Sequence, residues 1–541
     1  MNWKEQAANA VKKGTNWAAQ IKRLVRPGWG LSPKHARRLY TGVAIPRFLY
    51  GVDVWALPTE RKGEDESTTG NRHAVNRLAS VQRPGALAIV GGLRTSPTDS
   101  LCAHANIIPM NLEVEKQCGR AALRMATLPG QHPLTKIARK CARRKVKKHK
   151  SPLHLLENTY EMDPGKYESI PIATRNPARI GKEPFKLHIL SSKEESKKEV
   201  AQAPEHIKIY TDGSAHDGKV GAAAIMIKDG KNMGKLRYHL GKDSEHTVFE
   251  AELVGILLGL QLIKDSRQSN LTYTIGVDNQ AAIKSLTSMM DKPGHYLAAE
   301  ILDTTLRLKK SMGKKYSLSI RWTAGHSGIE GNEKADEEAK AAAGGKTLDN
   351  AQLPKMLRKP LKVSRSAARQ RLNKQIKEEW IKTWKASPRY GKMKHIDSSL
   401  PSRKFVELIS TPDIHRESAS KIFQLRTGHI PLNAYLHRFK LAESAQCPAC
   451  GAPKETPQHF VLECPAYEYE RKRTLKPKKG RLELKYAEIV GRKGEAVALA
   501  HYILDTKRFA QDTQKLLEKQ AESAKKQGKL RAENPPRSGR N

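Results

Sequence analysis

The chain has 541 residues and no apolar run approaching the ~18 residues that a membrane-spanning helix needs. Its first residues, Met-Asn-Trp-Lys-Glu-Gln, also lack the apolar stretch of a secretory signal peptide. We therefore expect a protein of the nucleus or cytoplasm that is not secreted. Only six cysteines are present, and three of them (Cys102, Cys118 and Cys141) are scattered as ordinary buried or free thiols are. Nothing here indicates a disulfide framework.

Acidic residues are scarce relative to basic ones. Lys and Arg total 98 against 55 Asp and Glu, which gives a formal net charge of +43. Such a surplus concerns partners and solubility rather than fold, and it favours nucleic acid over the weaker alternative of an anionic membrane surface. One dense basic run is compatible either with a solvated, disordered stretch or with a nucleic-acid or nuclear-import contact. It comprises Arg139, Lys140, Arg143, Arg144, Lys145, Lys147, Lys148 and Lys150.

The length suggests three or four globular units of about 150 residues each. Composition and periodicity divide the chain into a mainly helical region, a basic linker, an α/β domain, a basic helical connector, a cysteine-rich segment and a helical or disordered tail. Their boundaries are 1–135, 136–203, 204–345, 346–440, 441–470 and 471–541. In the connector, Trp380 and Trp384 lie one helical turn apart, a spacing more typical of packing than of base stacking.

Two aspartates end strand-like runs in the α/β domain. The alternating stretch 207–212 finishes at Asp212 before Gly213, and the stretch 271–278 finishes at Asp278 before a helical segment. If the two strands are parallel neighbours they lie about 4.8 Å apart, and both carboxylates reach the edge where open α/β sheets bind ligands. Each aspartate alone could equally be a turn or cap residue. Together they indicate a site.

Two glutamates compete for a third position beside these aspartates. Thr247-Val-Phe-Glu250 has the form of a capping box, in which Glu250 has a structural task. Glu252 has no such task and shares a helix face with Gly255 and Gly259, which would allow the helix to approach the strand closely. We therefore expect Glu252 to join the aspartates. Crowded acids of this kind are stable only around positive charge, for which a pair of divalent metal ions is the natural candidate.

A histidine and a fourth acid follow the third β-like run, 318–322. Glycines near His326 on both sides place it in a loop, where it could shuttle protons or assist product release, although a plain surface histidine remains possible. Asn332 and Asp336 are four residues apart on the next helix and therefore share a face. Ser327 and Glu330 could form a second capping box. Three more glutamates of this helix are expected to be solvated, namely Glu333, Glu337 and Glu338.

These segments resemble type 1 ribonuclease H. Tyr-Thr-Asp-Gly-Ser, Ala-Glu-Leu, Val-Asp-Asn and Gly-His-Ser-Gly-x-x-Gly-Asn-Glu-x-Ala-Asp occur in the family's order over about 207–345. The resemblance implies an α/β fold with a five-stranded mixed sheet and helices on both sides, and hydrolysis of the RNA strand of an RNA–DNA hybrid to 5′-phosphomonoesters. It assigns two Mg²⁺ ions, or Mn²⁺, to four carboxylates, an auxiliary role to His326, and nucleic-acid contacts to three polar neighbours. The carboxylates are Asp212, Glu252, Asp278 and Asp336; the neighbours are Ser214, Asn279 and Asn332.

One family feature is missing. Between the helix after Asp278 and the helix around 296–310 there is no separate basic helix of the kind that some members use to grip the hybrid. Other basic segments would have to supply that grip.

Four residues near the C-terminus have the spacing of a zinc knuckle, C-x2-C-x8-H-x4-C. Cys447, Cys450, His459 and Cys464 suit one closed, tetrahedral, structural Zn²⁺ site. A redox Cys-x-x-Cys pair is the alternative, but it leaves the histidine and third cysteine unexplained.

The flanks resemble parts of LINE-like, non-LTR retrotransposon polyproteins. The knuckle with the preceding segment 425–436 resembles their C-terminal region, and residues 30–57 resemble the segment after the polymerase palm. A Tyr-x-Asp-Asp polymerase motif is absent, so we expect no DNA synthesis, and a separate reverse transcriptase could be a partner. Two functions remain open: a metal-dependent hybrid ribonuclease without its polymerase centre, and a non-catalytic nucleic-acid-binding remnant of a retroelement.

Overall fold

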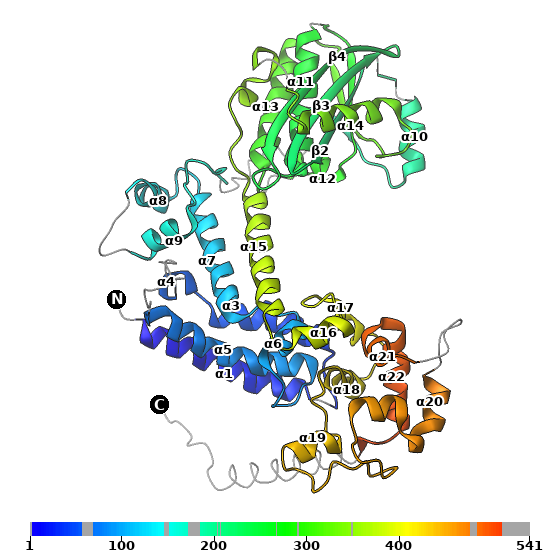
Figure 1. The fold of residues 1–541 in the computed structure, drawn as a ribbon. Coiled ribbons are helices and arrows are strands. Elements are labelled where there is room, and N and C mark those ends of the chain that lie inside the picture. The colour runs from blue at the N-terminus through cyan, green and yellow to red at the C-terminus, as the bar shows by residue number, and fades with distance from the viewer. Residues whose placement is uncertain are drawn as a thin grey trace, which may run out of the picture. The chain divides into compact units, whose positions relative to one another are not determined.

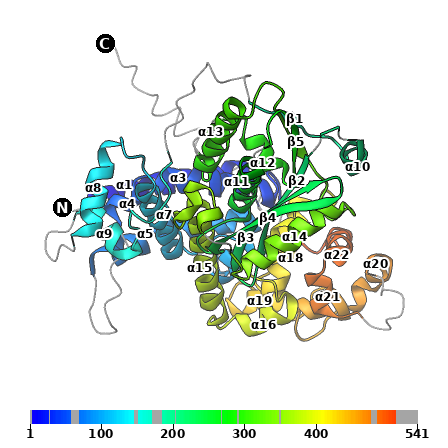
Figure 2. The ribbon, with the colours of Figure 1, turned by 90° about the horizontal axis from the view of Figure 1, so that it is seen from above.

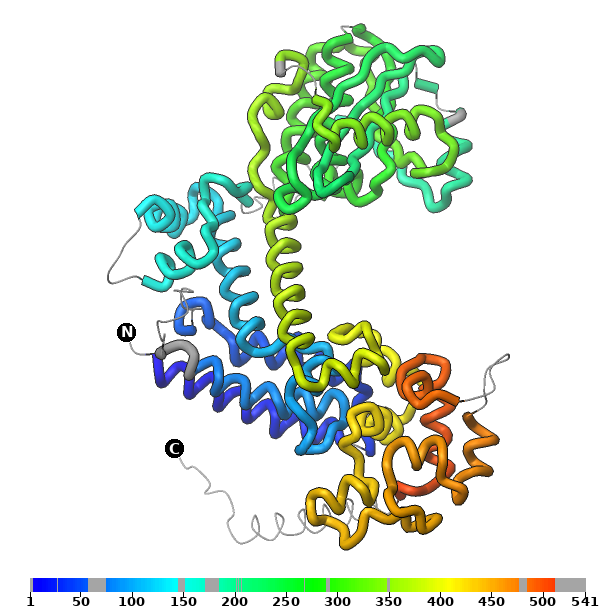
Figure 3. The backbone as a smooth tube through the Cα atoms, in the orientation of Figure 1, coloured from blue at the N-terminus to red at the C-terminus, as the bar shows by residue number. Residues whose placement is uncertain are grey.

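The structure is a computed structural model, and its chain path is traced in Figure 3. It describes residues 3–26, 28–56, 69–144, 151–170, 184–202, 204–205, 207–266, 268–288, 292–347, 350–475 and 484–510. The chain forms two compact units. Unit 1 comprises Met1–Glu115 and Ile376–Asn541, and unit 2 comprises Lys116–Gln375. Two helices, α7 (Met110–Ala126) and α15 (Arg365–Lys385), run across the boundaries between them.

Unit 2 is built on a mixed sheet of order β1-β6-β5-β2-β3-β4. Its strands are β1 (Lys186–His188), β2 (Ile207–His216), β3 (Lys219–Lys228), β4 (Lys231–Lys242), β5 (Thr272–Val277) and β6 (Ser317–Trp322). Strands β2, β3 and β4 form an antiparallel meander, whereas β2, β5, β6 and β1 pair in parallel. The five strands expected from the sequence are β2–β6, and β1 is an unexpected sixth.

Helices cover both faces of the sheet (Figures 1 and 2). One face carries α11 (Val248–Ser266), whose residues from Glu250 to Ile263 are almost all buried, with α13 (His295–Ser311) packed on it. The other face carries α14 (Glu330–Ala343), which contacts β2 and β3 through small residues such as Ala335 and Ala339. A short helix, α12 (Gln280–Ser285), follows β5. The sheet with helices on both sides confirms the fold expected from the sequence.

Strand β2 is longer than expected. It continues past Asp212 to His216 as an arm of a hairpin with β3, so Asp212 pairs with Ala223 and does not end the strand. The parallel ladder with β5, however, stops at the pair Thr211–Val277. Asp212 and Asp278 therefore each follow the last parallel pair, which preserves the expected juxtaposition although the predicted strand end was wrong.

The segment expected as a basic linker, 136–203, is partly structured where it is described. It contains most of α8 (Pro133–Arg143), then α9 (Pro152–Tyr160), β1 and α10 (Lys193–Gln202). Arg321 of β6 is buried and forms ion pairs with Glu199 of α10 and with Glu205. These contacts make residues 184–202 and 204–205 part of the α/β domain. Of the basic run, only Arg139, Lys140, Arg143 and Arg144 lie within the described residues.

The start of the predicted basic connector, 346–362, also contributes to the α/β domain through its described residues. Its described part holds two short 3₁₀ helices, η3 (Asn350–Gln352) and η4 (Lys355–Arg358). Leu353 and Leu357 are buried in the same apolar cluster as β2, β5 and α11. Because most of their sequence neighbours are polar, these two leucines were not recognised from the sequence as residues that anchor the segment to the core.

Unit 1 is helical in its described residues, as expected for the flanking regions. Before residue 116 it contains α1 (Lys4–Leu24), α2 (Pro33–Leu39), the π-helix η1 (Tyr40–Ala44), α3 (Ile45–Phe48), α4 (Val52–Trp55), α5 (Thr69–Val90) and α6 (Thr98–Ala105). After residue 375 it contains α16 (Tyr390–Ile396), α17 (Lys404–Leu408), α18 (Arg416–Thr427), α19 (Asn433–Arg438), η5 (His459–Glu463), η6 (Pro465–Tyr467), α20 (Glu468–Thr474), α21 (Tyr486–Gly491) and α22 (Lys493–Asp505).

Two tryptophans of α15 are buried in unit 1. Trp380 and Trp384 are 6% and 3% exposed, and Trp384 meets Tyr390 edge to face. They are therefore packing residues, as their spacing favoured. The tail at 511–541 lies outside the described residues. Among the described helices, none has the length and apolar character required to cross a bilayer.

Candidate active site and metal centres

Three predicted carboxylates come together where the parallel ladder of β2 and β5 ends. One oxygen each of Asp212, Glu252 and Asp278 lies within 4.8 Å of the others. They come from β2, α11 and the residue after β5. Asp212 and Glu252 are buried, at 5% and 3% exposed, and Asp278 is half-buried. The sequence-based choice of Glu252 agrees with this placement.

The capping box predicted for α11 explains why Glu250 is elsewhere. Its Oε2 accepts hydrogen bonds from the Thr247 amide at 2.8 Å and hydroxyl at 3.0 Å, while the Thr247 hydroxyl accepts from the Glu250 amide at 3.3 Å. The helix is thereby fixed at its first turn. Glu252 lies two residues on, about 200° further round the helix axis, and faces the aspartates instead.

Glycines bring α11 close enough to the strand. A Cβ placed on Gly255 would lie 3.2 Å from Thr211 Cβ, and one on Gly259 would lie 3.1 Å from Ile209 Cγ2. Gly213 of β2 is tighter still, because its Cβ would lie 2.5 Å from the Glu252 amide nitrogen. The predicted close approach of helix and strand is thus confirmed, and Gly213 adds to it from the strand side.

Burial and mutual repulsion make this cluster unfavourable without a cation. Burial, then Asp278 and Asp336, raises the pKa of Asp212 to about 7. Burial raises the pKa of Glu252 well above its usual range, with Asp278 and Asp212 adding to the effect. Burial likewise raises the pKa of Asp278. The Glu252 Oε2 atom is buried with no hydrogen-bond partner. A cluster of three carboxylates, one of which has an oxygen without a hydrogen-bond partner, fits the ligand chemistry of Mg²⁺ or Mn²⁺.

Asp336 lies near this cluster but outside the group of three. Its Oδ2 pairs with Lys340 Nζ at 2.7 Å, one turn along α14. Its negative charge nevertheless contributes to raising the pKa values of both Asp212 and Asp278. Lys340 partly offsets the rise in the pKa of Asp212, so it is a further neighbour of the site. It was not predicted from the sequence, although its i,i+4 spacing from Asp336 indicated an ion pair on one helix face.

His326 lies in the exposed loop between β6 and α14. Its φ of +50° and that of Gly328, +78°, form a tight turn. Burial raises the pKa of Asp278 and His326 partly offsets this rise, so the imidazole borders the cluster. A Cβ on Gly325 would lie 2.8 Å from Asp278 Oδ2, which keeps this loop against the carboxylate.

A serine from the presumed linker holds the same loop. The buried Ser196 hydroxyl of α10 donates to the Trp322 carbonyl at 2.9 Å and accepts from the Ala324 amide at 3.1 Å. The Trp322 indole in turn donates to the Asp278 carbonyl at 2.9 Å. No motif in the sequence marked Ser196, because this contact depends on folding of a segment over 120 residues away.

The three predicted nucleic-acid contacts are placed differently from one another. Ser214 is half-buried in β2. Asn279 is half-buried and caps α12, with its Oδ1 accepting from the Ala281 and Ala282 amides at 3.0 and 3.2 Å. Asn332 is only 3% exposed, and its Oδ1 has no hydrogen-bond partner. Only Ser214 and Asn279 are thus accessible at the surface.

Two smaller expectations for α14 were wrong. Ile329 caps the helix, and the Ser327 hydroxyl donates to the Ala324 carbonyl, so there is no capping box with Glu330. Glu338 is not solvated, because it pairs with Lys235 and Arg237 of β4. Between α12 and α13 the described residues contain no separate basic helix, as the sequence indicated.

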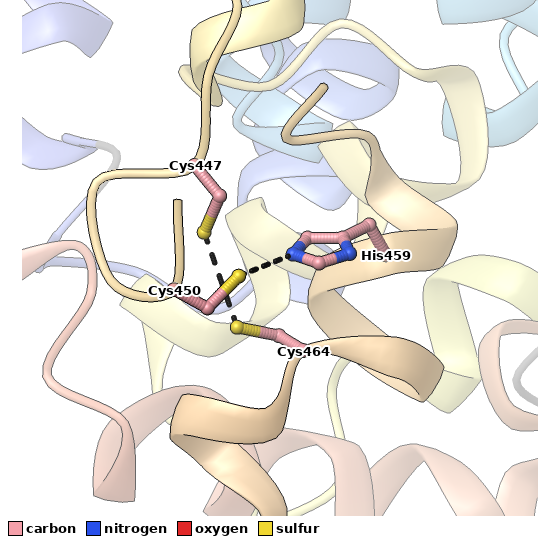
Figure 4. A group of neighbouring side chains, drawn as sticks. All are labelled: Cys447, Cys450, His459 and Cys464. Atoms are coloured by element: carbon pink, nitrogen blue, oxygen red, sulfur yellow. Dashed lines mark hydrogen bonds between the residues drawn. The ribbon is translucent and has the colours of Figure 1, made fainter. Parts of the chain in front are cut away.

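A second candidate centre lies in unit 1 and is shown in Figure 4. Cys447, Cys450, His459 and Cys464 each offer a ligand atom within 4.8 Å of the others. The Cys447 and Cys464 sulfurs are 3.9 Å apart, and Cys450 Sγ is 3.3 Å from His459 Nε2. A tetrahedral zinc site with bonds of about 2.0–2.3 Å has edges close to these distances.

Local backbone geometry presents these four ligands. Gly451, with φ of +77°, closes the turn after Cys450, and its amide donates to the Cys447 carbonyl at 2.9 Å. The π-turn η5 connects His459 to Cys464, whose amide donates to the His459 carbonyl at 2.8 Å. Burial raises the pKa of Cys464 to about 12. Zinc binding would have to displace that proton, which is how such sites couple metal to folding.

Comparison with known proteins identifies the α/β domain. The RNase H family profile matches residues 204–344. A ribonuclease H of Jannaschia sp. (strain CCS1) is 32% identical over 142 residues, which cover 24% of this chain and 87% of that protein. An archaeal RNase H1 structure from Halobacterium salinarum NRC-1 is 18% identical and covers 26% of this chain and 98% of its own, with a TM-score of 0.21.

A second group of relatives consists of retrotransposon polyproteins. The Pol polyprotein of the type-1 retrotransposable element R1 4 from Nasonia vitripennis is 40% identical over 67 residues. That match covers 12% of this chain and 17% of the polyprotein's length. The profile covers the domain that holds the three clustered carboxylates, and the bacterial relative is 32% identical over 87% of its length, so the chain belongs to the ribonuclease H family.

Proposed function

We propose that this protein hydrolyses the RNA strand of RNA–DNA hybrids, as an endonuclease that depends on divalent metal ions. The observation that carries the proposal is the convergence of Asp212, Glu252 and Asp278 within 4.8 Å, with a buried, unpartnered Glu252 oxygen. Similarity to the Jannaschia ribonuclease H over most of that protein's length supports the same activity.

Asp212, Glu252 and Asp278 would hold the metal, and Asp336 would complete the set of ligands on exchanging Lys340 for a cation. Two Mg²⁺ ions, or Mn²⁺, held by these residues would supply an activated water and stabilisation of the leaving 3′ oxygen, with 5′-phosphomonoesters as products. The rigid β2 strand and the capped α11 helix fix the positions of the first two carboxylates. Their burial keeps bulk water away and strengthens each charge interaction.

His326 is suited to an auxiliary task because it lies on an exposed turn beside Asp278. A histidine there can take or give a proton and assist product departure. Ser214 and Asn279, which are both half-buried, would contact the hybrid bound at the cluster. Recognition of RNA over DNA would depend on contacts to 2′-hydroxyls, while the chain's basic surplus would hold the phosphates.

The cysteine–histidine cluster would bind one structural Zn²⁺ and so stabilise a loop-rich part of unit 1. We assign it no part in hydrolysis, since four protein ligands leave the ion no open position for a water or substrate. A separate reverse transcriptase is the proposed protein partner, by analogy with the polyproteins to which the chain is similar.

The decisive experiment follows cleavage of a labelled RNA–DNA hybrid by the full chain with Mg²⁺, beside Asp278→Asn. Cleavage by the wild type and at least a hundred-fold loss in the variant, with hybrid binding retained, is expected from removal of a metal ligand. Glu250→Gln serves as the control, because Glu250 is a buried acid of the same domain that caps α11 and lies outside the carboxylate cluster. Equal binding without cleavage by either protein would instead identify a non-catalytic nucleic-acid-binding remnant.

A further inference from the structure

A cavity in unit 1 has a lining that none of the preceding functions uses. Its volume is about 770 Å³. Its walls come from α5, the loop before α6 and the start of α6, α16 with the loop before it, the end of α18 and the end of α19. The lining residues that carry charge or can become charged are Arg83, Asp99, Arg389, Lys392, His429 and Arg438. All belong to the same compact unit.

Cations outnumber acids in this lining by four to one. Asp99 Oδ2 accepts a hydrogen bond from the Ser387 hydroxyl at 2.6 Å and lies 3.5 Å from Arg389 Nη1. Arg83 donates to neutral acceptors, the Thr98 hydroxyl and the Ser96 carbonyl among them. Among the described residues, neither Lys392 nor Arg438 pairs with a carboxylate. The fold therefore gathers positive charge here and leaves most of it unneutralised.

The fields of these cations overlap inside the cavity. Burial lowers the pKa of His429, and the positive charges of three neighbours lower it further. These neighbours are Arg438, Lys392 and Arg389. Burial and Arg438 lower the pKa of Lys392 in the same way. Like charges held in proximity are costly unless a counter-charge joins them. The cavity therefore has the opposite charge to the carboxylate cluster, and a bound anion would stabilise it.

Phosphate is the anion that fits best. Arginine forks and lysine are the usual ligands of phosphate oxygens. The Arg438 guanidinium lies over Tyr435 and Phe439, and Phe439 is 41% exposed. An exposed aromatic ring beside a phosphate site offers a surface on which a base can stack.

We propose that this cavity binds the phosphodiester backbone of a nucleic-acid strand, at a site separate from the carboxylate cluster. It would anchor nucleic acid on unit 1 whether or not the RNase H domain is engaged. The proposal does not depend on catalysis.

The test compares two double variants of the full chain that remove the same charges. Lys392→Gln with Arg438→Gln neutralises the cavity, and Lys22→Gln with Arg23→Gln neutralises two exposed positions at the end of α1. Binding of a fluorescent oligothymidine is followed by anisotropy over a range of salt, without added Mg²⁺. The cavity variant should bind about ten-fold more weakly, with a salt slope smaller by about 2 units. The α1 variant should change affinity less than about two-fold.

A charge-preserving variant and two competitors separate a nucleic-acid strand from a different anion. Lys392→Arg with Arg438→Lys keeps both charges and should bind like the wild type, and retained zinc in each variant shows that unit 1 is folded. Equal effects of the cavity and α1 variants would overturn the proposal. Stronger competition by polyglutamate than by unlabelled oligothymidine would overturn it in favour of an acidic protein. Inorganic phosphate that competes at the oligonucleotide's own concentration would overturn it in favour of a small phosphate ligand.

Discussion

A Cβ atom added to Gly213 would lie 2.5 Å from the backbone nitrogen of Glu252, so the strand that carries Asp212 and the helix that carries Glu252 meet at this glycine. The added Cβ would meet backbone atoms of α11, so no side-chain rotation can relieve the clash. The distance between two of the three clustered carboxylates therefore depends on the absence of one methyl group.

Gly213→Ala should push α11 away from β2 and separate Glu252 from Asp212. We expect destabilisation of about 1–3 kcal/mol, as for other overpacked sites, and a loss of hybrid cleavage larger than the loss of hybrid binding. Gly130→Ala is the matched control, since a Cβ there meets nothing within 4 Å. Thermal unfolding and cleavage rates of the two variants decide it. Wild-type cleavage by Gly213→Ala would show that the approach is not required.

Asp212→Asn should stabilise the metal-free domain at neutral pH. The folded-state pKa of Asp212 is raised from 3.8 to about 7. A raised carboxyl pKa means that the folded state holds the proton more tightly, so stability is lost as pH rises from about 4 through about 7. The wild type should lose a few kcal/mol over this window relative to the variant.

Hydrogen exchange of α11 and β5 peptides, compared between wild type and Asp212→Asn at each pH, measures this difference. Mg²⁺ should restore protection in the wild type only, because it neutralises the clustered charges. Identical profiles with and without Mg²⁺ would count against a metal at this cluster.

Ser196→Ala should loosen the loop that bears His326. The substitution leaves the buried Ala324 amide without its partner, at a cost of about 1–3 kcal/mol. We expect kcat for hybrid cleavage to fall about three- to ten-fold, with little change in the Mg²⁺ concentration required. Ser191→Ala is the control, because that exposed hydroxyl donates to Glu195 and not to the loop. A change confined to KM would argue against a positioning role for Ser196.

Cys450→Ser should abolish zinc binding while hybrid cleavage persists. Three remaining ligands hold Zn²⁺ far more weakly than a closed set of four. Elemental analysis should find one zinc per wild-type chain and none in the variant, and unit 1 should become more sensitive to protease. One equivalent of zinc in the variant would refute the assigned ligand set.

Much of the carboxylate site was accessible from sequence because its residues lie in local patterns. The alternation before Asp212 and Asp278 predicted neighbouring strands, and the Thr247–Glu250 capping box freed Glu252 for the cluster. The cysteine spacing likewise predicted a cluster that the structure brings together. Periodicity and capping are properties of short segments, so they can be recognised in the sequence without knowledge of the tertiary structure.

The tertiary structure alone decided what depends on distant segments. It extended β2 beyond Asp212 through pairing with β3, and it recruited β1 and α10 from a stretch whose polar composition indicated a linker. It paired Asp336 with Lys340, buried Asn332, and gathered Arg83, Lys392 and Arg438 around one cavity. Local sequence determines which elements form, whereas charge proximity and burial arise only when elements far apart in the chain pack together.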